Sequence, residues 1–414
     1  MTVMTIAEAA QVFASPEAYA NDDYFHQACD LLRAQQPVVR VETEWAYPFW
    51  AVTKHADVLE VEARPGIFTN DPRPVLVPRE DDDSVAANGT LLRTLIHMDD
   101  PDHRNYRSVT AEWFLPKSMA RLDGRLAELA TASVAKMEAL GGTCDFARDI
   151  TMQYPLQVIL AILGLPDSDY NRMLALTQEL FGSQDPELQR GTTAEDRNAV
   201  LMDFFAYFTA LIENRRANPT DDLASVIANA HINGELIPVL EAMGYYTIIA
   251  TAGHDTTSSS MAGGMLALIN NPDQLVRLQN HPELMPSAVD EMIRHTSPVK
   301  HFIRTAQEDY TLRGTKISKG DSVLLSCSSA NRNEDVFIDP HQFDVGRTPN
   351  KQLAFGFGVH CCLGAILARI KLKAPFSAII ARLDSILLNS IPALTQSTFV
   401  SGLKRLPITY TLCS

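Results

Sequence analysis

The sequence is best interpreted from one segment, Phe355-Gly356-Phe357-Gly358-Val359-His360-Cys361-Cys362-Leu363-Gly364. It places a cysteine between glycines, just before a predicted helix. Gly358 lets the backbone turn without a Cβ clash, and Gly364 lets the helix lie close to a flat macrocycle. We expect the helix N-terminus and its backbone N–H groups to lower the pKa of the Cys362 thiol. The pattern therefore predicts that Cys362 presents its sulfur in one direction, as a metal ligand.

This segment resembles the ligand loop of the cytochrome P-450 haem-thiolate monooxygenases, which reads Phe-x-x-Gly-x-x-x-Cys-x-Gly. Phe355, Gly358, Cys362 and Gly364 match it. The resemblance implies haem b (iron protoporphyrin IX) as cofactor, with the Cys362 thiolate as axial ligand. Cys361 comes one residue too early and is interpreted as a small apolar residue of the loop. The alternative is a turn before a buried helix in which both cysteines only pack.

Composition indicates one large globular unit. The 414 residues are 46% hydrophobic and 21% charged, which is enough apolar material for a sizeable core. No linker rich in Gly, Ser or Pro divides the chain, so we expect a single domain over 1–414. The net charge of −15 argues against nucleic acid as a partner.

Cysteine usage and the N-terminal sequence indicate a cytoplasmic protein. The six cysteines are scattered without framework spacing, as expected in a reducing compartment. Residues 1–23 lack the basic start and apolar run of a signal peptide or anchor. The most apolar long segment, near 245–268, contains His254, Asp255 and several hydroxyl residues, which makes it a poor bilayer span. We therefore expect no membrane association.

Helical patterns dominate, and short strands are expected in two regions. β-branched and aromatic residues around a turn predict strands near 37–42 and 48–53, and more strands follow residue 298. Helices are expected at 119–140, 154–163, 167–181 and 194–216. The acidic, proline-containing segment 73–89 is interpreted as a mobile loop, of the kind that often forms a lid.

One long helix is expected from about 235 to 270, and it would cross the whole domain. In its middle lies Ala252-Gly253-His254-Asp255-Thr256-Thr257, where small residues let a planar cofactor approach and a carboxylate and a hydroxyl follow. Buried polar groups need partners. On one interpretation the hydroxyls only bond to carbonyls one turn earlier; the cysteine loop favours a catalytic role instead.

The same segment resembles the family's oxygen-activating motif, Ala/Gly-Gly-x-Asp/Glu-Thr. By that resemblance Thr256 steadies the oxygen species on the iron, Asp255 relays protons from solvent, and Ala252 and Gly253 lie against the cofactor. The resemblance also implies the cytochrome P-450 fold, mainly α with a small β region. The haem would lie between the long central helix and the helix after the cysteine loop. We expect β-rich parts near 37–53 and 298–414 and the helical bulk near 100–297 and 362–382.

Another motif is structural. Glu291 and Arg294 lie three apart on one predicted helix face, close enough to pair. In the family this Glu-x-x-Arg pair is buried and is joined by an arginine of the following meander, for which Arg347 is the candidate. The resemblance implies that the three brace the backbone leading into the cysteine loop.

The resemblance further implies cations for the two haem propionates, whose burial would otherwise be costly. Four residues occupy the family's positions, namely His103, Arg107, Arg304 and His360. His103 and Arg107 are four apart on one face of a predicted helix. Taken singly, each is better interpreted as a solvated surface charge; the four together favour propionate binding.

The chain is similar over nearly its whole length to soluble bacterial members that hydroxylate terpene alcohols such as alpha-terpineol. The blocks 51–59, 251–260 and 399–402 carry this likeness. By family position, and together with the loop near 68–95, the substrate pocket is lined by Ile248, Thr251, Ala252, Val299, Phe302, Phe399 and Val400. Apolar walls bind by area and shape, so we expect a neutral hydrophobic substrate, such as a terpenoid, an alkyl-aromatic or a steroid. Core packing is the alternative for each side chain.

Electrons are expected to come from other proteins, because the chain has no flavin, nicotinamide or iron–sulfur motif. Similar bacterial enzymes use a ferredoxin and a ferredoxin reductase, and they are mostly monomers. Arg369, Lys371 and Lys373 form a candidate docking patch, although a solvated helix face explains them equally well. The implied reaction inserts one oxygen atom of O2 into a C–H bond of the substrate.

Three other functions remain open. A haem sensor or carrier would not need the Asp255–Thr256 pair. In peroxide-driven peroxygenases and isomerases of this family the acid–alcohol pair is typically altered, whereas it is intact here. Zinc binding by Cys361 and Cys362 lacks the spaced ligand pairs of tetrahedral sites.

Overall fold

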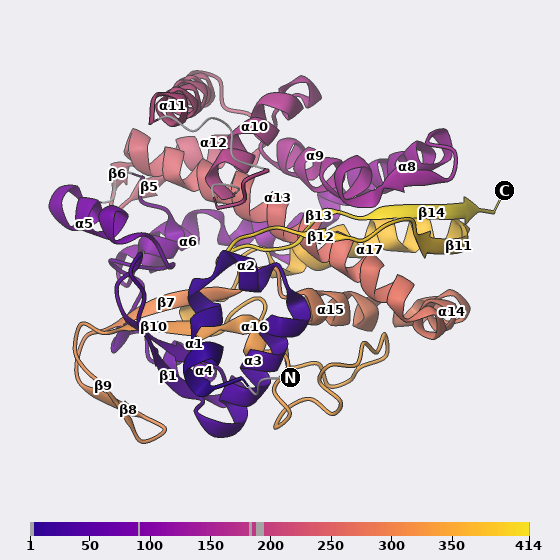
Figure 1. The fold of residues 1–414 in the computed structure, drawn as a ribbon. Helices are drawn as coiled ribbons and strands as arrows, with labels where there is room; N and C mark the ends of the chain where they lie inside the picture. The colour runs from indigo at the N-terminus through magenta and orange to yellow at the C-terminus, as the bar shows by residue number, and fades with distance from the viewer. Residues whose placement is uncertain (1–3, 90–91, 182–183, 188–193, 414) are drawn as a thin grey trace.

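The computed structural model describes residues 4–89, 92–181, 184–187 and 194–413. It is mainly helical, with a smaller β-rich region beside the N-terminal helices (Figure 1). The predicted fold class is therefore confirmed. One large apolar core cluster joins the long helices, and two smaller clusters lie under the N-terminal helices and the main sheet.

The long helices make up most of the fold. They are α3 Asp22–Gln35, α5 Arg79–Asn88, α6 Asp102–Ala111, α8 Asp123–Ala139, α9 Gln153–Ile162, α10 Tyr170–Phe181, α11 Ala194–Ala217, α13 Val239–Asn270, α14 Pro272–Asn280, α15 Met285–Thr296 and α17 Ala365–Arg382. The shorter helices are α1 Ile6–Gln11, α2 Pro16–Tyr19, α4 His55–Glu62, α7 Pro116–Met119, α12 Leu223–Ala228 and α16 Cys327–Ala330. The helices predicted at 154–163, 167–181 and 194–216 are confirmed to within a few residues.

Helix α13 runs through the middle of the helical core (Figure 1). Its 32 residues span about 48 Å at about 1.5 Å per residue. It packs against α9, α11, α15 and α17, which hold its central turns away from bulk water. The helix starts later than predicted, because 235–236 pairs with 231–232 as the β5–β6 hairpin and Pro238 then precedes the first turn.

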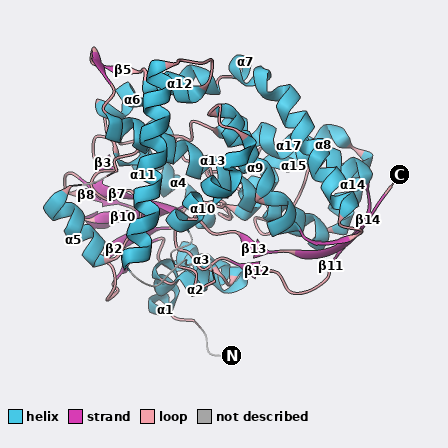
Figure 2. Ribbon diagram, turned by 90° about the horizontal axis from the view of Figure 1, so that it is seen from above, coloured by secondary structure: helices cyan, strands magenta, loops and turns pink. Residues whose placement is uncertain are grey.

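The main sheet has five strands in the order β1-β2-β10-β7-β3. These strands are β1 Val38–Val41, β2 Phe49–Val52, β10 Ser322–Ser326, β7 His301–Ala306 and β3 Phe68–Thr69. Only the β2–β10 pair is parallel; its neighbours in this sheet pair antiparallel. The two predicted β regions thus meet in one sheet, which lies to one side of the helices in the view from above (Figure 2).

The remaining strands form small ribbons. They are β4 Thr143–Asp145, β5 His231–Ile232, β6 Glu235–Leu236, β8 Tyr310–Leu312, β9 Thr315–Ile317, β11 Leu383–Leu388, β12 Ala393–Leu394, β13 Leu403–Arg405 and β14 Pro407–Leu412. The β12–β13 ribbon matters most for the site, because the loop between its strands includes Phe399 and Val400.

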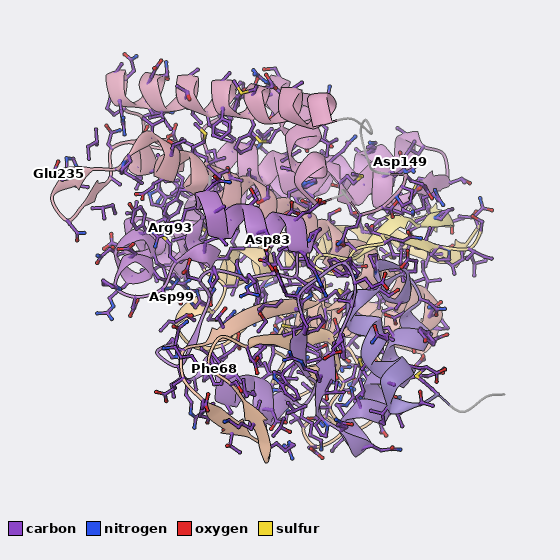
Figure 3. All side chains as sticks on the ribbon, turned by 60° about the vertical axis from the view of Figure 1, so that its left-hand side comes forward. Phe68, Asp83, Arg93, Asp99, Asp149 and Glu235 are labelled. Atoms are coloured by element: carbon purple, nitrogen blue, oxygen red, sulfur yellow. The ribbon has the colours of Figure 1, made fainter. Side chains whose placement is uncertain are left out.

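The prediction of a loop over 73–89 is wrong for residues 79–88, which form helix α5. Glu80, Asp81 and Asp82 stand in its first turn, where negative charge favours the helix dipole. Gly89 ends the helix at φ +75°. No residue of α5 is buried, and Asp83 accepts a hydrogen bond from Tyr47 Oη at 2.7 Å. Figure 3 shows α5, with Asp83, on the outside of the molecule.

The Glu291–Arg294–Arg347 brace is present as the resemblance implied. Arg294 donates to both Glu291 oxygens at 2.7 Å, and Arg347 Nε lies 3.1 Å from them. The Glu291 and Arg294 side chains are fully buried. The same guanidinium groups also donate to backbone carbonyls between 331 and 342. The buried charges therefore hold the meander that precedes the cysteine loop.

Glu291→Gln is expected to lower the free energy of unfolding by about 3 kcal/mol or more, because two buried guanidinium groups lose their charged partner. Urea unfolding followed by fluorescence measures this. The control is Asp167→Asn, which breaks the exposed Arg125–Asp167 pair and is expected to cost about 0–1 kcal/mol. Equal losses in the two variants would contradict the role of the brace.

Candidate functional site

The cysteine loop has the backbone that its glycines predict. Gly356 and Gly358 have φ angles of +66° and +67°, a region that residues with a side chain rarely occupy. A Cβ at Gly358 would stand 2.8 Å from the backbone oxygen of Glu62, so no side chain fits there. Cys362 N donates to Phe355 O at 2.8 Å, which closes the loop. The Cys362 side chain is thereby left open to a cavity between α13 and α17.

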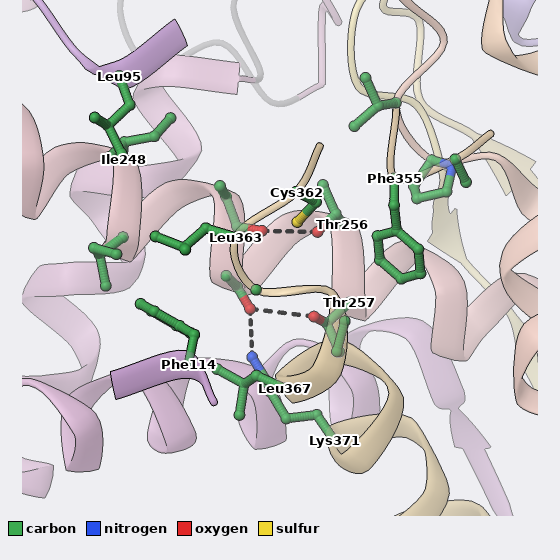
Figure 4. A pocket seen from close by; sticks show the side chains of 18 of the residues that line it. Leu95, Phe114, Ile248, Thr256, Thr257, Phe355, Cys362, Leu363, Leu367 and Lys371 are labelled. Atoms are coloured by element: carbon green, nitrogen blue, oxygen red, sulfur yellow. Dashed lines mark hydrogen bonds between the residues drawn. The ribbon is translucent and has the colours of Figure 1, made fainter. Parts of the chain in front are cut away.

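This cavity is large and mostly apolar (Figure 4). Its empty space, counting the part open to solvent, amounts to about 1330 Å³. Its wall also includes Phe355, Leu363, Gly364 and Leu367 from the loop and from α17. A Cβ on Gly364 would stand 4.0 Å from the Cys362 sulfur, so a side chain at this position would lie beside the thiol.

The thiol differs from expectation in one respect. Burial raises the pKa of Cys362 to about 11, and the hydrogen bond from the Gly364 backbone lowers it only in part. The backbone N–H of Gly364 thus lowers the pKa of the thiol as predicted, but burial outweighs it. A coordinated thiol is deprotonated by the metal ion itself, so iron binding would supply the driving force that the helix does not.

The central turn of α13 faces the cysteine loop across the cavity. Thr256 lines the cavity, and its Oγ1 donates to Ala252 O at 2.7 Å, which leaves the oxygen lone pairs able to accept. Thr257 Oγ1 donates to Gly253 O at 3.2 Å. A Cβ on Gly253 would stand 2.3 Å from Ile159 Cδ1, so α9 requires a glycine here. The hydroxyls thus bond to carbonyls one turn earlier, as one interpretation of the sequence expected, and Thr256 also faces the cavity, as the other required.

Asp255 lies beside Thr256 but is not among the described residues that line the cavity. Its Oδ2 is buried without a hydrogen-bond partner in the described part of the chain, and Oδ1 lies 3.4 Å from His254 Nδ1. Burial raises the pKa of Asp255 to about 7. A carboxyl that titrates near neutrality can both accept and release a proton, which suits the predicted relay.

Three of the four predicted propionate ligands line the cavity, namely His103, Arg107 and His360. The rings of His103 and His360 have their centroids 4.1 Å apart, and Arg107 donates to Cys361 O at 2.6 Å. The Nε2 atom of His360 is buried without a hydrogen bond within the described chain and lies 3.9 Å from Asp99 Oδ1. A cluster of two imidazoles and a guanidinium beside an open thiol fits the dianionic propionates of a haem. Arg304 is buried behind this wall and pairs with Glu62 at 3.4 Å.

The predicted substrate residues divide into two groups. Ile248, Ala252, Val299 and Phe302 line the cavity, as expected. The remaining three, Thr251, Phe399 and Val400, are not among its lining residues within the described chain, so their role in substrate binding stays a prediction. Thr251 is buried and donates to Thr247 O at 2.7 Å. Phe399 stands behind Phe302, with ring centroids 5.6 Å apart, and Val400 pairs with Val299 as a β-bridge.

Several lining residues have no sequence signal. They are Ile96, Phe114, Ile159, Ile162, Ile249 and Leu372. Each is an apolar residue in or next to a helix, and such residues have the same spacing whether they face a core or a cavity. Leu95 also lines the cavity; it belongs to the loop that was predicted near 68–95.

The candidate docking patch on α17 is also wrong in part. Lys371 is buried and lines the cavity, where its ammonium donates to Gly253 O. Lys373 is exposed, and Arg369 Nε lies 2.8 Å from Asp290 Oδ1. The three residues therefore do not form one surface patch.

The model of the family described as cytochrome P450 matches residues 79–412. The chain belongs to the cytochrome P450 family. Cytochrome P450-terp of Pseudomonas sp. is 38% identical over 409 residues, with 96% of each chain covered. Linalool 8-monooxygenase of Pseudomonas putida is 33% identical over 387 residues, with 92% of this chain and 95% of the relative covered. The crystal structure of CYP108D1 from Novosphingobium aromaticivorans superposes with a TM-score of 0.91 at 38% identity, covering 98% and 99% of the two chains.

Family membership assigns the general chemistry of this P450. It is a monooxygenase, and its haem is held through a cysteine thiolate. Cys362, the cysteine that the sequence motif predicts as ligand, opens into the cavity between α13 and α17. Within the described residues, no helix combines the length and apolar character needed to cross a bilayer.

Cys362→Ser is expected to abolish the thiolate-type band in the carbon monoxide difference spectrum of the reduced protein, because a serine oxygen cannot donate as a thiolate does. Cys361→Ser is the matched control and is expected to keep the band, since Arg107 holds only its backbone oxygen. A normal band in the Cys362 variant, or loss of the band in the Cys361 variant, would contradict the assignment.

Asp255→Asn is expected to change how stability depends on pH. The pKa of Asp255 is about 7 in the fold and about 3.9 in an unfolded chain. The folded state therefore binds this proton more tightly than the unfolded chain does. Protonated Asp255 stabilises the fold fully at pH values below the pKa of the unfolded chain, and this stabilisation is lost as pH rises to about 7. Urea midpoints measured between about pH 5 and 8 should fall less steeply in the variant than in the native protein. Parallel curves would contradict this, and Asp123→Asn, at an exposed position, is the control.

Proposed function

We propose that this P450 hydroxylates a compact, neutral, hydrophobic substrate of the terpenoid class. The observation that carries the proposal is the composition of the cavity wall opposite Cys362. Ile248, Val299 and Phe302 line it together with the side chains of α9 and of the segment before α6. Such a wall binds ligands mainly through buried apolar area and complementary shape, and it offers few groups that orient a polar ligand.

The bound haem would supply the oxygen chemistry, with its iron held by Cys362 and its propionates received by His103, Arg107 and His360. The chain's own residues do the rest. Thr256 offers its hydroxyl oxygen to the cavity, and Asp255 holds a proton one residue away. The apolar wall would exclude bulk water and hold the substrate beside the haem.

The relatives favour the terpenoid class over other hydrophobic compounds. Two relatives whose similarity covers more than nine-tenths of this chain are named cytochrome P450-terp and linalool 8-monooxygenase. Steroid C26-monooxygenase of Mycolicibacterium smegmatis is also similar, at 34% identity over 88% of the chain. A cavity wall can be redirected by a few substitutions, so steroids and alkyl-aromatics belong among the compounds tested.

We also propose that electrons arrive singly from a separate ferredoxin and its reductase. The family match begins at residue 79 and ends at 412, and the sequence has no flavin, nicotinamide or iron–sulfur motif. Lys373 is exposed on α17, the helix that follows the ligand. An acidic carrier could approach this side through complementary charge.

Terpenoids are expected to shift the Soret band of the purified holoprotein with roughly micromolar affinity, because they displace water from an apolar wall. Titrations with alpha-terpineol, linalool, a steroid and an alkyl-aromatic compare the classes. A charged sugar phosphate is the negative control. Strong shifts with the control alone would overturn the proposed substrate class.

Turnover is the second arm of this test. NADH consumption with added ferredoxin and reductase should yield a hydroxylated product, whereas omission of the ferredoxin should stop it. Spectral binding without any product under reduction would favour a sensor or carrier. Product formed with peroxide alone, at the same rate, would favour a peroxygenase.

A further inference from the structure

Lys371 is a buried cation that the chemistry described so far does not use. It lies on α17, nine residues after Cys362, with 1% of its surface exposed. Its side chain reaches across to α13, where the ammonium donates to the carbonyl oxygen of Gly253. In Figure 4 the dashed lines from Lys371 and from Thr257 meet at one oxygen.

Burial of this ammonium is costly and needs a structural reason. Among the described residues, no carboxylate pairs with Lys371, and burial lowers the pKa of its side chain to about 7. Lys404 is a contrast within the same chain, because its ammonium lies 3.0 and 2.9 Å from the two oxygens of Asp185. A methionine at 371 would fill the same space without this cost. The Gly253 carbonyl is thus the described group that compensates the buried charge.

The carbonyl that Lys371 holds belongs to the turn that carries the acid and the alcohol. Gly253 O accepts from both Lys371 and Thr257, and the preceding carbonyl, Ala252 O, accepts from Thr256. Hydroxyls that bond one turn back bend a helix. On its other side, Gly253 is in contact with Ile159 of α9. Gly253 therefore lies between Ile159 of α9 and Lys371 of α17.

These contacts at Gly253 affect Asp255 and Thr256, which follow it by two and three residues. Asp255 Oδ2 has no partner among the described residues, and Oδ1 lies 3.4 Å from His254 Nδ1 in the same turn. Thr256 is held through Ala252 O, which is also part of this turn. The direction of both groups thus depends on the position of the turn, and Lys371 bonds this turn to α17, the helix that follows the cysteine loop.

We propose that Lys371 is a positioning residue for oxygen activation: its ammonium holds the Gly253 carbonyl and so fixes the turn that carries Asp255 and presents Thr256 to the cavity. The proposal rests on the monooxygenase activity, not on the identity of the substrate. Lys371 links α17, the helix that follows the cysteine loop, to the turn of α13 that contains Asp255 and Thr256. Lys371 itself need not touch the reacting atoms.

The test compares Lys371→Met, which keeps most of the apolar stem but removes the donor, with Lys371→Gln, which keeps a shorter, uncharged donor. Thr256→Ala sets the scale for a lost hydroxyl, and Lys316→Met, at an exposed lysine that pairs with Asp309, is the control for loss of a lysine. All are prepared as holoproteins. Haem content and the carbon monoxide spectrum are expected to equal those of the native protein, because Cys362 is untouched.

Two measurements then decide. In turnover with any ligand that shifts the Soret band, Lys371→Met should divert electrons to peroxide and lower the product formed per NADH roughly tenfold, the effect expected for a lost charged hydrogen bond. The dissociation constant of that ligand should stay within about twofold. Amide hydrogen exchange of the peptide containing 253–257 should be roughly tenfold faster. Lys371→Gln should fall between Lys371→Met and the native protein in both measurements.

Full coupling together with native exchange in Lys371→Met would overturn the proposal. If Lys371→Met does not retain haem, Lys371→Gln decides: lower coupling and faster exchange support the proposal, whereas native values overturn it. Higher coupling in Lys371→Gln than in Lys371→Met also separates a positioning role from a general loss of stability, because a general loss of stability would not depend on whether residue 371 has a hydrogen-bond donor. Hydrogen exchange needs no substrate, so failure of every terpenoid would refute the proposed substrate class and leave this result standing.

Discussion

The structure depends on one thiol being open to a cavity from one side only. This requires a backbone that few residues can adopt, with Gly358 at φ +67° and in contact with the Glu62 carbonyl. The loop then closes through the Cys362 N–H and the Phe355 carbonyl. Helix α13 crosses the other side of the cavity, so the sulfur and the acid–alcohol turn face one space. A protein that lost this loop would keep its helices and have no place for the cofactor.

Charge burial is the second constraint, and it acts in two ways. Where the charges are matched, as in Glu291 with Arg294 and Arg347, they hold the meander that leads to the cysteine loop. Where they are unmatched, burial disfavours the charged form. The pKa of Asp255 rises to about 7 and the pKa of Lys371 falls to about 7 for this same reason. Both groups contact or belong to the Gly253–Thr256 turn, which is therefore flanked by side chains that change charge near neutrality.

Residues with strict backbone or spacing requirements could be predicted. Gly358, Cys362 and the Glu291–Arg294 pair stand where their patterns indicate, because a turn or a helix face is a local property. Lys371 and Phe399 could not be predicted in the same way. A lysine about two turns into a helix is normally solvated, and only the approach of α13 explains its burial. Phe399 contacts the ring of Phe302, which lines the cavity, but is not itself among the lining residues of the described chain.

The sequence by itself determined the glycine-flanked cysteine loop and the spacing of the Glu291–Arg294 pair, since each is encoded within a few consecutive residues. The resemblance of these motifs to a known family implied the cofactor, the oxygen-activating turn and the fold class. The cavity wall could be predicted only in part. Which apolar side chains of α9, α13 and the segment before α6 line the cavity depends on how whole helices are rotated against one another. Packing across long sequence separations decides this, and no local pattern records it.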